Sequence, residues 1–351
     1  MRWLIAFALA TAVACKGDTT TSSGGPPRPY RIGFSAIAPR PEIPVVLRTI
    51  DEMSQHSDAA LLPLTPPWKS MLADTSAALL VRRDQLGLVQ LYRSRNFPII
   101  AMIDVTDGLA RDREAPELVA LHRSIAEPAV QAKYKEYVLA VDSILHPDYL
   151  ALAMETNLIR FAAPQVVYDA MRAMTNAVVP SLRAQHTSAK LYVSVQVDVA
   201  WGRLQGTTTF IGIDRDLQDF PFIEALGLSA YPYLAGFANP EDVPLDYYSR
   251  LQPSSGVPML VVEGGWTSAS LGAIQSSPEK QARWIARQFE LADRAHLAGI
   301  FQITYTDLDA VSYGSPPNLA VFTQLGLVDT GFHAKPALAT WDSGYLRSYV
   351  R

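Results

Sequence analysis

The sequence predicts an α/β protein built as one (β/α)₈ barrel, and three observations support this fold class. From Tyr30 onward, short apolar runs alternate with amphipathic stretches, a pattern typical of parallel strands joined by crossover helices. Eight such runs occur, whereas a doubly wound sheet rarely extends to eight equal repeats. The chain has 351 residues, a length that fits a single barrel and can bury a large core without disulfides or metal.

The expected elements follow one another in a regular order. The eight expected strands lie at 30–37, 59–64, 97–105, 149–154, 191–199, 226–231, 258–262 and 299–304. The clearest expected helices lie at 43–55, 76–95, 126–145, 164–185, 279–296 and 336–349, and Pro164 suits a first helical turn. We find no internal sequence repeat and no second domain, so the barrel is expected to cover residues 30–351.

The N-terminus resembles a sorting signal. Met1-Arg2 is followed by an apolar stretch at 3–13 that is too short to span a bilayer as a mature helix. Ala12-Val13-Ala14-Cys15 then resembles the cleavage box of a bacterial lipoprotein, in which Cys15 becomes the lipidated first residue. A plain secretory signal with a chance cysteine is the alternative.

The remaining features near the N-terminus agree with a lipid anchor. Cys15 is the only cysteine of the chain, so no intramolecular disulfide can form. Residues 16–29 are rich in Thr, Ser, Gly and Pro, a composition typical of a flexible linker. We therefore expect a signal peptide at 1–14, a tether at 15–29, and a protein held through lipid on the membrane of a bacterial cell envelope, on its periplasmic or cell-surface side.

Composition and motifs exclude several classes of function. The formal net charge is −4 and no basic stripe stands out, so nucleic acid is not an expected partner. The six histidines are scattered without zincin spacing, which argues against a catalytic metal. No glycine-rich phosphate loop follows the first strand, so no nucleotide cofactor is expected. We expect neither a cofactor nor a metal.

Barrel enzymes carry their chemistry where strands end and βα loops begin. The polar and aromatic residues at these positions are Trp68, Asp104, Asp107, Glu155, Asn157, Asp198, Trp201, Tyr231, Tyr233, Glu263, Trp266, Gln302 and Tyr305. Among them, Glu155 and Glu263 each follow directly on an apolar run. An ionisable side chain at such a position costs free energy unless it has a partner, so these two glutamates are candidate functional groups.

Two carboxyl groups facing each other are what cleavage of a glycosidic bond requires. One donates a proton to the leaving oxygen, and the other attacks the anomeric carbon or activates water. The fourth and seventh strands lie across the barrel mouth, so Glu155 and Glu263 can share a cleft, and a separation of about 5–5.5 Å would support the retaining reaction. A pair of solvated loop glutamates is the alternative.

The other candidates have two interpretations each. Asp104 and Asp107 are able to bind a sugar hydroxyl or a cation, or simply to cap the turn that leaves the third strand. Trp201 and Trp266 are able to form platforms for sugar rings, or merely to pack a loop.

The arrangement resembles clan A of the glycoside hydrolases, and within it the arabinogalactan endo-β-1,4-galactanases of family 53. Leu-Ser-Ala-Tyr-Pro-Tyr at 228–233 resembles the Ser-Tyr-Tyr-Pro-aromatic run of that family's sixth strand. Val-Val-Glu-Gly-Gly-Trp at 261–266 is similar to its nucleophile strand, and Ile103-Asp104 with Asp107 resembles its acidic third-strand loop. The similarity follows the whole barrel in order and is detailed in strands four, six and seven.

The resemblance implies a role for each matching residue. Glu155 would be the acid/base, Glu263 the nucleophile, and the Tyr231 hydroxyl would orient Glu263 and hold it ionised. Glu155 would then stay protonated because anionic Glu263 lies beside it. The expected substrate-binding residues are Asp104, Asp107, Asn157, Trp201, Tyr233, Trp266, Gln302 and Tyr305.

The chain departs from the clan at several positions. Met154 stands where the clan has an asparagine that bonds the sugar 2-hydroxyl, and methionine cannot donate that bond. Asn157 comes two residues after the glutamate, Val105 replaces a histidine after Asp104, and Gln302 with Tyr305 replaces the usual tryptophan platform. These departures leave three hypotheses open.

The first hypothesis is a retaining glycoside hydrolase for a β-linked polysaccharide or oligosaccharide, with galactan among the candidates. The second is a non-catalytic carbohydrate-binding envelope lipoprotein with a degenerate glycosidase cleft. The third is a barrel of unrelated function, in which Glu155 and Glu263 should lie far apart.

Overall fold

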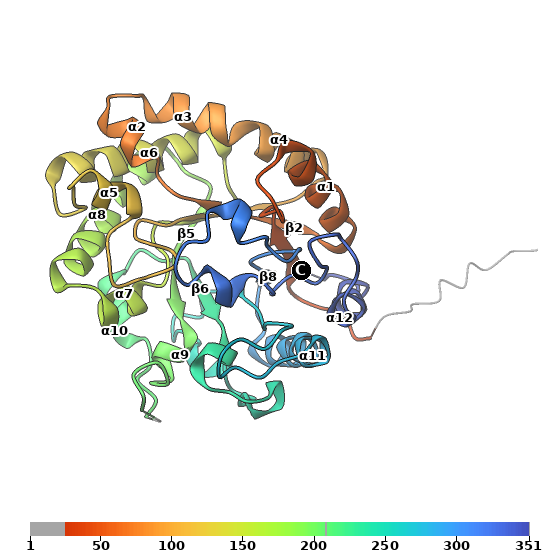
Figure 1. The fold of residues 1–351 in the computed structure, drawn as a ribbon. Coiled ribbons are helices and arrows are strands. Elements are labelled where there is room, and N and C mark those ends of the chain that lie inside the picture. Colours follow the sequence, from red (N-terminus) through yellow and green to blue (C-terminus); the bar gives the residue numbers. More distant parts are fainter. Residues whose placement is uncertain (1–24, 208, 351) are drawn as a thin grey trace, which may run out of the picture.

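The protein is a closed barrel of eight parallel strands in the order β1 to β8. The structure, a computed structural model, describes residues 25–207 and 209–350, so the expected signal peptide, Cys15 and most of the tether lie outside the described residues. Helices form a ring around the strands (Figure 1). The predicted (β/α)₈ fold is therefore confirmed.

The strands are β1 (Arg31–Ser35), β2 (Ala59–Leu64), β3 (Ile99–Ile103), β4 (Tyr149–Ala151), β5 (Lys190–Gln196), β6 (Ala225–Ala230), β7 (Met259–Gly264) and β8 (Gly299–Gln302). The α-helices are α1 (Ile43–Met53), α2 (Trp68–Leu72), α3 (Ala77–Asp84), α4 (Leu86–Ser94), α5 (Pro116–Ala120), α6 (Pro128–Leu145), α7 (Thr156–Ala162), α8 (Gln165–Ala184), α9 (Val197–Ala200), α10 (Asp214–Asp219), α11 (Pro278–Ala295) and α12 (Pro336–Tyr345). Among the described residues, no helix has the length and apolar character needed to cross a membrane.

Several expected elements differ from the observed ones at their ends, among them β4, which ends at Ala151 and not at 154, and two of the differences have clear local reasons. The helix expected at 76–95 is divided into α3 and α4 at Gln85, whose φ of −123° leaves the helical region. The fifth strand ends at Gln196 instead of 199, because the Gln196 side chain accepts a hydrogen bond from the Val199 amide and starts helix α9. A side-chain cap of this kind favours a helix start over a longer strand.

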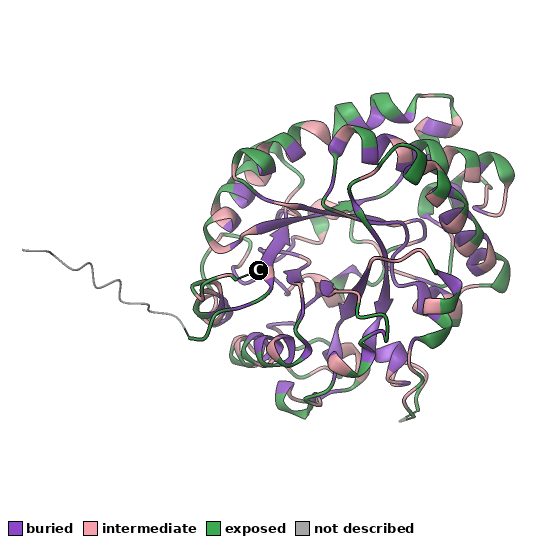
Figure 2. Cartoon of the chain, turned by 180° about the vertical axis from the view of Figure 1, so that it is seen from behind, coloured by how far each residue is buried: buried purple, intermediate pink, exposed green. Residues whose placement is uncertain are grey.

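The strands are buried on both faces, as a parallel barrel requires. Inside the barrel, side chains such as Tyr192, Leu260 and Phe301 form one apolar cluster. A larger cluster fills the space between the strands and the helices. Figure 2 shows the buried strands at the centre and the exposed outer faces of the helices. Most large aromatic side chains belong to this packing, including Tyr30, Tyr134, Trp284 and Trp341.

The barrel begins slightly before the boundary expected from the sequence. Arg28, which we assigned to the tether, is only 3% exposed and forms an ion pair with Asp58 at 2.7 Å. It also forms a parallel bridge with Tyr349, near the other end of the chain. The last residues of the expected tether are therefore part of the folded domain.

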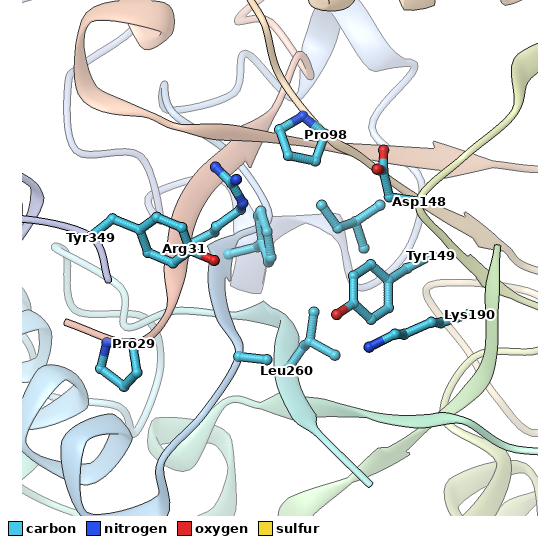
Figure 3. Close-up of a pocket in the computed structure, with 11 residues that line it drawn as sticks. Pro29, Arg31, Pro98, Asp148, Tyr149, Lys190, Leu260 and Tyr349 are labelled. Atoms are coloured by element: carbon cyan, nitrogen blue, oxygen red, sulfur yellow. The ribbon is translucent and has the colours of Figure 1, made fainter. Parts of the chain in front are cut away.

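A cavity of about 330 Å³ lies at the amino-terminal ends of the strands. Figure 3 shows Arg31, Tyr149, Lys190 and Tyr349 around it, with the Arg31 guanidinium against the ring of Tyr349. Because barrels carry their chemistry at the opposite, carboxyl-terminal mouth, this cavity is separate from the candidate site.

A substitution at Gly33 tests how closely β1 and β2 approach each other. A Cβ at Gly33 would lie 2.1 Å from the backbone oxygen of Ala59, its partner in register, so Gly33→Ala forces two strands apart. We expect it to lower the free energy of unfolding by at least about 2 kcal/mol, measured by urea denaturation.

Gly87→Ala, in α4, is the matched control because its Cβ would meet nothing within 4 Å. It should leave stability unchanged or raise it by up to about 1 kcal/mol. Equal stability of the Gly33 variant and the wild type would contradict the close packing of β1 against β2.

Candidate active site

Glu155 and Glu263 meet at the carboxyl-terminal mouth of the barrel. Glu155 is the residue before α7, four positions after the end of β4, and Glu263 lies near the end of β7. Ser229 of β6 connects them: its Cα pairs in register with Glu263, and its hydroxyl donates to Oε1 of Glu155 at 2.6 Å. The two carboxyl groups predicted from the sequence therefore belong to one site.

The backbone of Glu155 is held in an unusual conformation. Its φ of 47° and ψ of 45° lie in the left-handed region, which costs a residue with a side chain about 1–2 kcal/mol. The Glu155 amide donates to Oγ of Ser194 at 2.8 Å, and α7 starts from the Glu155 carbonyl through the Ile159 amide. Strained backbone of this kind concentrates at functional sites.

A bulge in β7 sets the position of Glu263. The register between β6 and β7 runs from Leu228 opposite Val261 to Ser229 opposite Glu263, so Val262 is left without a partner. Bulges of this type redirect side chains and are common beside active sites. The Tyr231 hydroxyl, at the end of β6, donates to Oε1 of Glu263 at 3.0 Å. The contact that the sequence assigned to Tyr231 is thus present.

A buried arginine, which we did not predict from the sequence, completes the site. Arg111 comes from the loop between β3 and α5 and is 6% exposed. Its Nε donates to Oε2 of Glu155 at 2.8 Å, and its Nη1 donates to both carboxylate oxygens of Asp104 at 2.6 and 2.7 Å. One buried cation therefore bonds two carboxylates, an arrangement stabilised by charge-assisted hydrogen bonds.

The electrostatics of the site favour the protonated form of Glu263. Burial raises the pKa of Glu263 to about 8, the charge of Glu155 adds to the increase, and Arg111 and the Tyr231 hydrogen bond oppose it. Arg111 and Ser229 donate hydrogen bonds to the two oxygens of Glu155. The expectation that Glu155 carries the proton during the reaction stays a prediction.

Two cavities meet at Glu263, which lines both. The larger, about 350 Å³, is lined by Asp104, Asp107, Arg111 and Met154 among others. The smaller, about 120 Å³, lies toward β8 and includes Tyr231, Leu319 and Phe322. Pockets of this kind, with an apolar lining and a few convergent polar groups, are typical small-molecule sites.

Asp104 and Asp107 keep their expected place beside the cavity, with different surroundings. Asp107 accepts a hydrogen bond from the Leu109 amide at 2.9 Å, so it also caps the turn, as the alternative interpretation stated. Asp104 is bonded to Arg111, whose positive charge disfavours a cation there. Within residues 25–207 and 209–350, no group of three or more His, Cys, Asp or Glu side chains is placed to hold a metal ion.

Six residues expected to bind substrate are instead engaged in internal contacts. None of them lines either cavity beside Glu263. Five have a polar atom bonded within the protein: Asn157 to the backbone of Gln196, Trp201 to the Tyr247 carbonyl, Tyr233 to the Val321 carbonyl, Trp266 to Ser276, and Gln302 to Gln288. The sixth, Tyr305, is buried with its ring edge against Phe34. Tyr233 and Trp266 line a separate cavity of about 360 Å³ between the loops after β6 and β7, so their expected role in binding substrate stays a prediction.

Sequence reasoning missed three residues of the site. Arg111 stands in the run Arg-Asp-Arg-Glu at 111–114, which has the composition of an exposed loop, and nothing local marks it as buried. Ser194 and Ser229 do carry a signal in the sequence that could have identified them, because each is a small polar residue inside a mostly apolar strand. A buried hydroxyl in such a strand needs a hydrogen-bond partner, which here is Glu155.

Comparison with known proteins gives no match by sequence and clear matches by structure. No family model matches the chain, and no curated protein matches it. An exo-β-1,4-mannosidase from Opitutaceae bacterium strain TAV5 superposes with a TM-score of 0.64 at 14% identity, covering 93% of this chain and 61% of that one. This chain therefore spans less than two thirds of the length of the mannosidase.

Two further structures match over nearly their whole length. The GH53 catalytic domain of Ignisphaera aggregans has a TM-score of 0.64 at 13% identity, with 90% of this chain and 96% of that chain covered. Xylanase 10B from Thermotoga maritima has a TM-score of 0.59 at 12% identity, with 91% and 95% covered. At these identities the likeness establishes the fold. The fold of this chain is thus the (β/α)₈ barrel that the mannosidase, the GH53 domain and the xylanase share.

Proposed function

We propose that the chain is a retaining glycoside hydrolase acting on a β-linked oligosaccharide or polysaccharide, with galactan among the candidates. Glu155 is the acid/base and Glu263 the nucleophile. The observation that carries the proposal is the pair of carboxyl groups from the ends of β4 and β7, whose charges interact beside a cavity of about 350 Å³. Two titratable groups held in contrasting environments are the usual basis for dividing acid and base roles.

The reaction proceeds in two displacements. Glu155 gives its proton to the glycosidic oxygen while Glu263 attacks the anomeric carbon, so the glycosidic C–O bond breaks and a glycosyl ester of Glu263 forms. Glu155 then takes a proton from water, which attacks the anomeric carbon and releases the Glu263 carboxylate. The Tyr231 hydroxyl stabilises that carboxylate through its hydrogen bond.

The position of the proton sets a condition on this cycle. Burial and the charge of Glu155 raise the pKa of Glu263, whereas the first step needs Glu263 ionised and Glu155 protonated. Substrate binding must therefore favour the ionised form of Glu263 and free Oε2 of Glu155 from Arg111. Two interacting carboxyl groups titrate as a pair, which couples these two changes.

A second candidate is a carbohydrate-binding protein without catalysis. The contact that favours it is the same ion pair, because Arg111 and Ser229 engage both oxygens of Glu155, so neither oxygen is free to meet a glycosidic oxygen. Met154 also lines the larger cavity at the position of the clan's asparagine. Activity measurements separate the two candidates.

Replacing either carboxyl group should abolish hydrolysis. We expect Glu155→Gln and Glu263→Gln each to lower kcat/KM by about 10²–10⁴-fold or more, since acid catalysis and nucleophilic attack are lost. The assay uses a panel of aryl β-glycosides and β-linked polysaccharides, including β-1,4-galactan, and NMR of the first-formed product tests retention.

Glu136→Gln, on the exposed face of α6, is the matched control and should retain full activity. A wild-type protein that binds sugar but hydrolyses nothing in the panel would contradict the proposed enzyme and favour the non-catalytic carbohydrate-binding protein.

Tyr231→Phe should move the pH profile. The Tyr231 hydrogen bond lowers the pKa of Glu263, so its loss raises that pKa and the ionised nucleophile forms only at higher pH. The acidic limb of kcat/KM should shift upward by about one pH unit. Tyr233→Phe, whose hydroxyl donates to the Val321 carbonyl, is the control and should not shift the limb. If the acidic limb of kcat/KM lies at the same pH in the wild type, Tyr231→Phe and Tyr233→Phe, Tyr231 does not act on Glu263.

Removing Arg111 should destabilise the fold in a pH-dependent way. Arg111→Met leaves the carboxylates of Asp104 and Glu155 without their buried counter-charge, which we expect to cost about 3–5 kcal/mol at pH 7. The loss should shrink toward pH 5, because the unpaired carboxyl groups can take up protons. Urea denaturation at both pH values measures it.

Arg113→Met, two positions along the same loop, removes an exposed guanidinium and should leave stability unchanged. Equal loss at the two pH values would mean that Arg111 stabilises the protein by packing and not through its charge.

A further inference from the structure

The segment between β8 and α12, residues 303–335, lies across the mouth of the barrel. We call it the β8 segment; it includes the short helices η5 (Val311–Tyr313) and η6 (Leu319–Phe322). In Figure 1 it is the blue stretch that passes over the centre of the ring. Its position decides how a substrate can reach Glu263.

One side of the β8 segment is attached to the loops that follow β1 and β3. The Asp309 amide donates to the Pro39 carbonyl at 3.0 Å, and the Tyr313 hydroxyl donates to the Ala38 carbonyl at 2.7 Å. Further along, Nδ2 of Asn318 donates to the Leu109 carbonyl at 2.9 Å. Leu109 lines both cavities beside Glu263, so this contact closes over the site.

The other side of the segment is attached to residues that follow β6 and, through Ser268, to the loop after β7. The Val321 carbonyl accepts a hydrogen bond from the Tyr233 hydroxyl at 2.7 Å, and the Phe322 ring meets the edge of Tyr231 at 5.2 Å. A buried ion pair between Asp307 and Lys335, at 2.7 Å, joins the two ends of the segment. The segment is therefore attached on both sides of the mouth.

The smaller cavity is the space beneath this cover. Leu308, Leu319 and Phe322 of the segment and Leu109 of the β3 loop line it together with Glu263. Its volume of about 120 Å³ is well below the 300 Å³ or so of ordinary ligand sites. A polysaccharide chain therefore has no room to continue past Glu263 on the β8 side.

The mouth is also filled on the side of β4 to β6. Asn157 and the Gln196 backbone exchange two hydrogen bonds, and the Tyr247 hydroxyl donates to Asp198 at 2.8 Å. Asn157, Gln196, Asp198 and Tyr247 are all buried. Of the two cavities that Glu263 lines, the one of about 350 Å³ on the side of β2 and β3 is the larger. A cavity of about 360 Å³ between the loops after β6 and β7 is lined by Tyr233 and Trp266 and does not include Glu263.

We propose that the enzyme acts on terminal sugars or small glycosides and does not cut internal bonds of a polysaccharide. This inference rests on the proposed glycosidase function. The terminal ring occupies the larger cavity, where Asp104, Asp107 and Thr65 face its hydroxyls and Met102 and Ile303 face its C–H groups. The mode of action then differs from that of the endo-acting galactanases which the sequence resembles.

Product analysis of the wild-type protein tests this proposal. Aryl β-glycosides first identify the accepted sugar, and oligosaccharides of that sugar, labelled at the reducing end, are then followed by mass spectrometry. We expect monosaccharide from the first turnovers, a labelled product shortened by one unit at a time, and no release of dye from a cross-linked polysaccharide. Early mid-length products or release of dye would overturn the proposal.

A failure of the proposed glycosidase function can be distinguished from a failure of this inference on terminal action. If the wild-type protein cleaves neither aryl glycosides nor oligosaccharides, the glycosidase assignment is wrong and this inference falls with it. Activity on aryl glycosides together with mid-length products keeps the glycosidase and rejects terminal action alone.

Asn318→Ala tests the cover itself by removing the contact with Leu109. We expect the share of mid-length products to increase several-fold, because the β8 segment and the β3 loop can then separate. Thr330→Ala, at an exposed position of the same segment, is the matched control and should keep the wild-type products. An unchanged product ratio in Asn318→Ala would overturn the role given to this contact.

Discussion

The candidate site depends on one buried positive charge. Arg111 bonds Asp104 and Glu155 directly, and its charge also acts on Glu263. Three carboxyl groups around one cation would leave two negative charges in excess inside the mouth, an arrangement that burial makes costly. The raised pKa of Glu263 fits this arrangement, because a proton there would remove one of them. The ion pair thus fixes the geometry of the site, and its positive charge acts on the titration of Glu263.

The same arginine connects elements that are distant in the sequence. It ties the β3 loop to Glu155, Ser229 extends the network to β6, and the β7 bulge brings Glu263 opposite Ser229. With the loop fixed in this way, the carbonyl of Leu109 is presented to Asn318 of the β8 segment. The β3 loop therefore contacts both the ion pair of the site and the cover over the mouth.

The sequence predicted the features that depend on local pattern. Strand periodicity gives the barrel, and an acidic residue directly after an apolar run gives Glu155 and Glu263. It could not predict which way a side chain turns once the strand has ended. Trp266 and Gln302 stand at expected positions, yet both are only 1% exposed and bonded internally. The burial of Arg111 and the left-handed backbone of Glu155 likewise arise from tertiary contacts, which no local run of residues encodes.

The structure shows how Met154 is accommodated at the position where clan A glycoside hydrolases have an asparagine. The Met154 thioether lies 3.7 Å from the Ser194 hydroxyl, which also accepts the Glu155 amide, so the methionine is accommodated without displacing the glutamate. The lost amide donor is not the only one available to a sugar hydroxyl. The hydrogen bonds of Arg111 run through Nε and Nη1, and the residue lines the larger cavity, so its guanidinium brings a strong donor to the wall that the ring would face. In the proposed glycosidase, Arg111 would therefore supply the hydrogen bond to the sugar that the asparagine gives in clan A, while the carboxyl pair keeps its place.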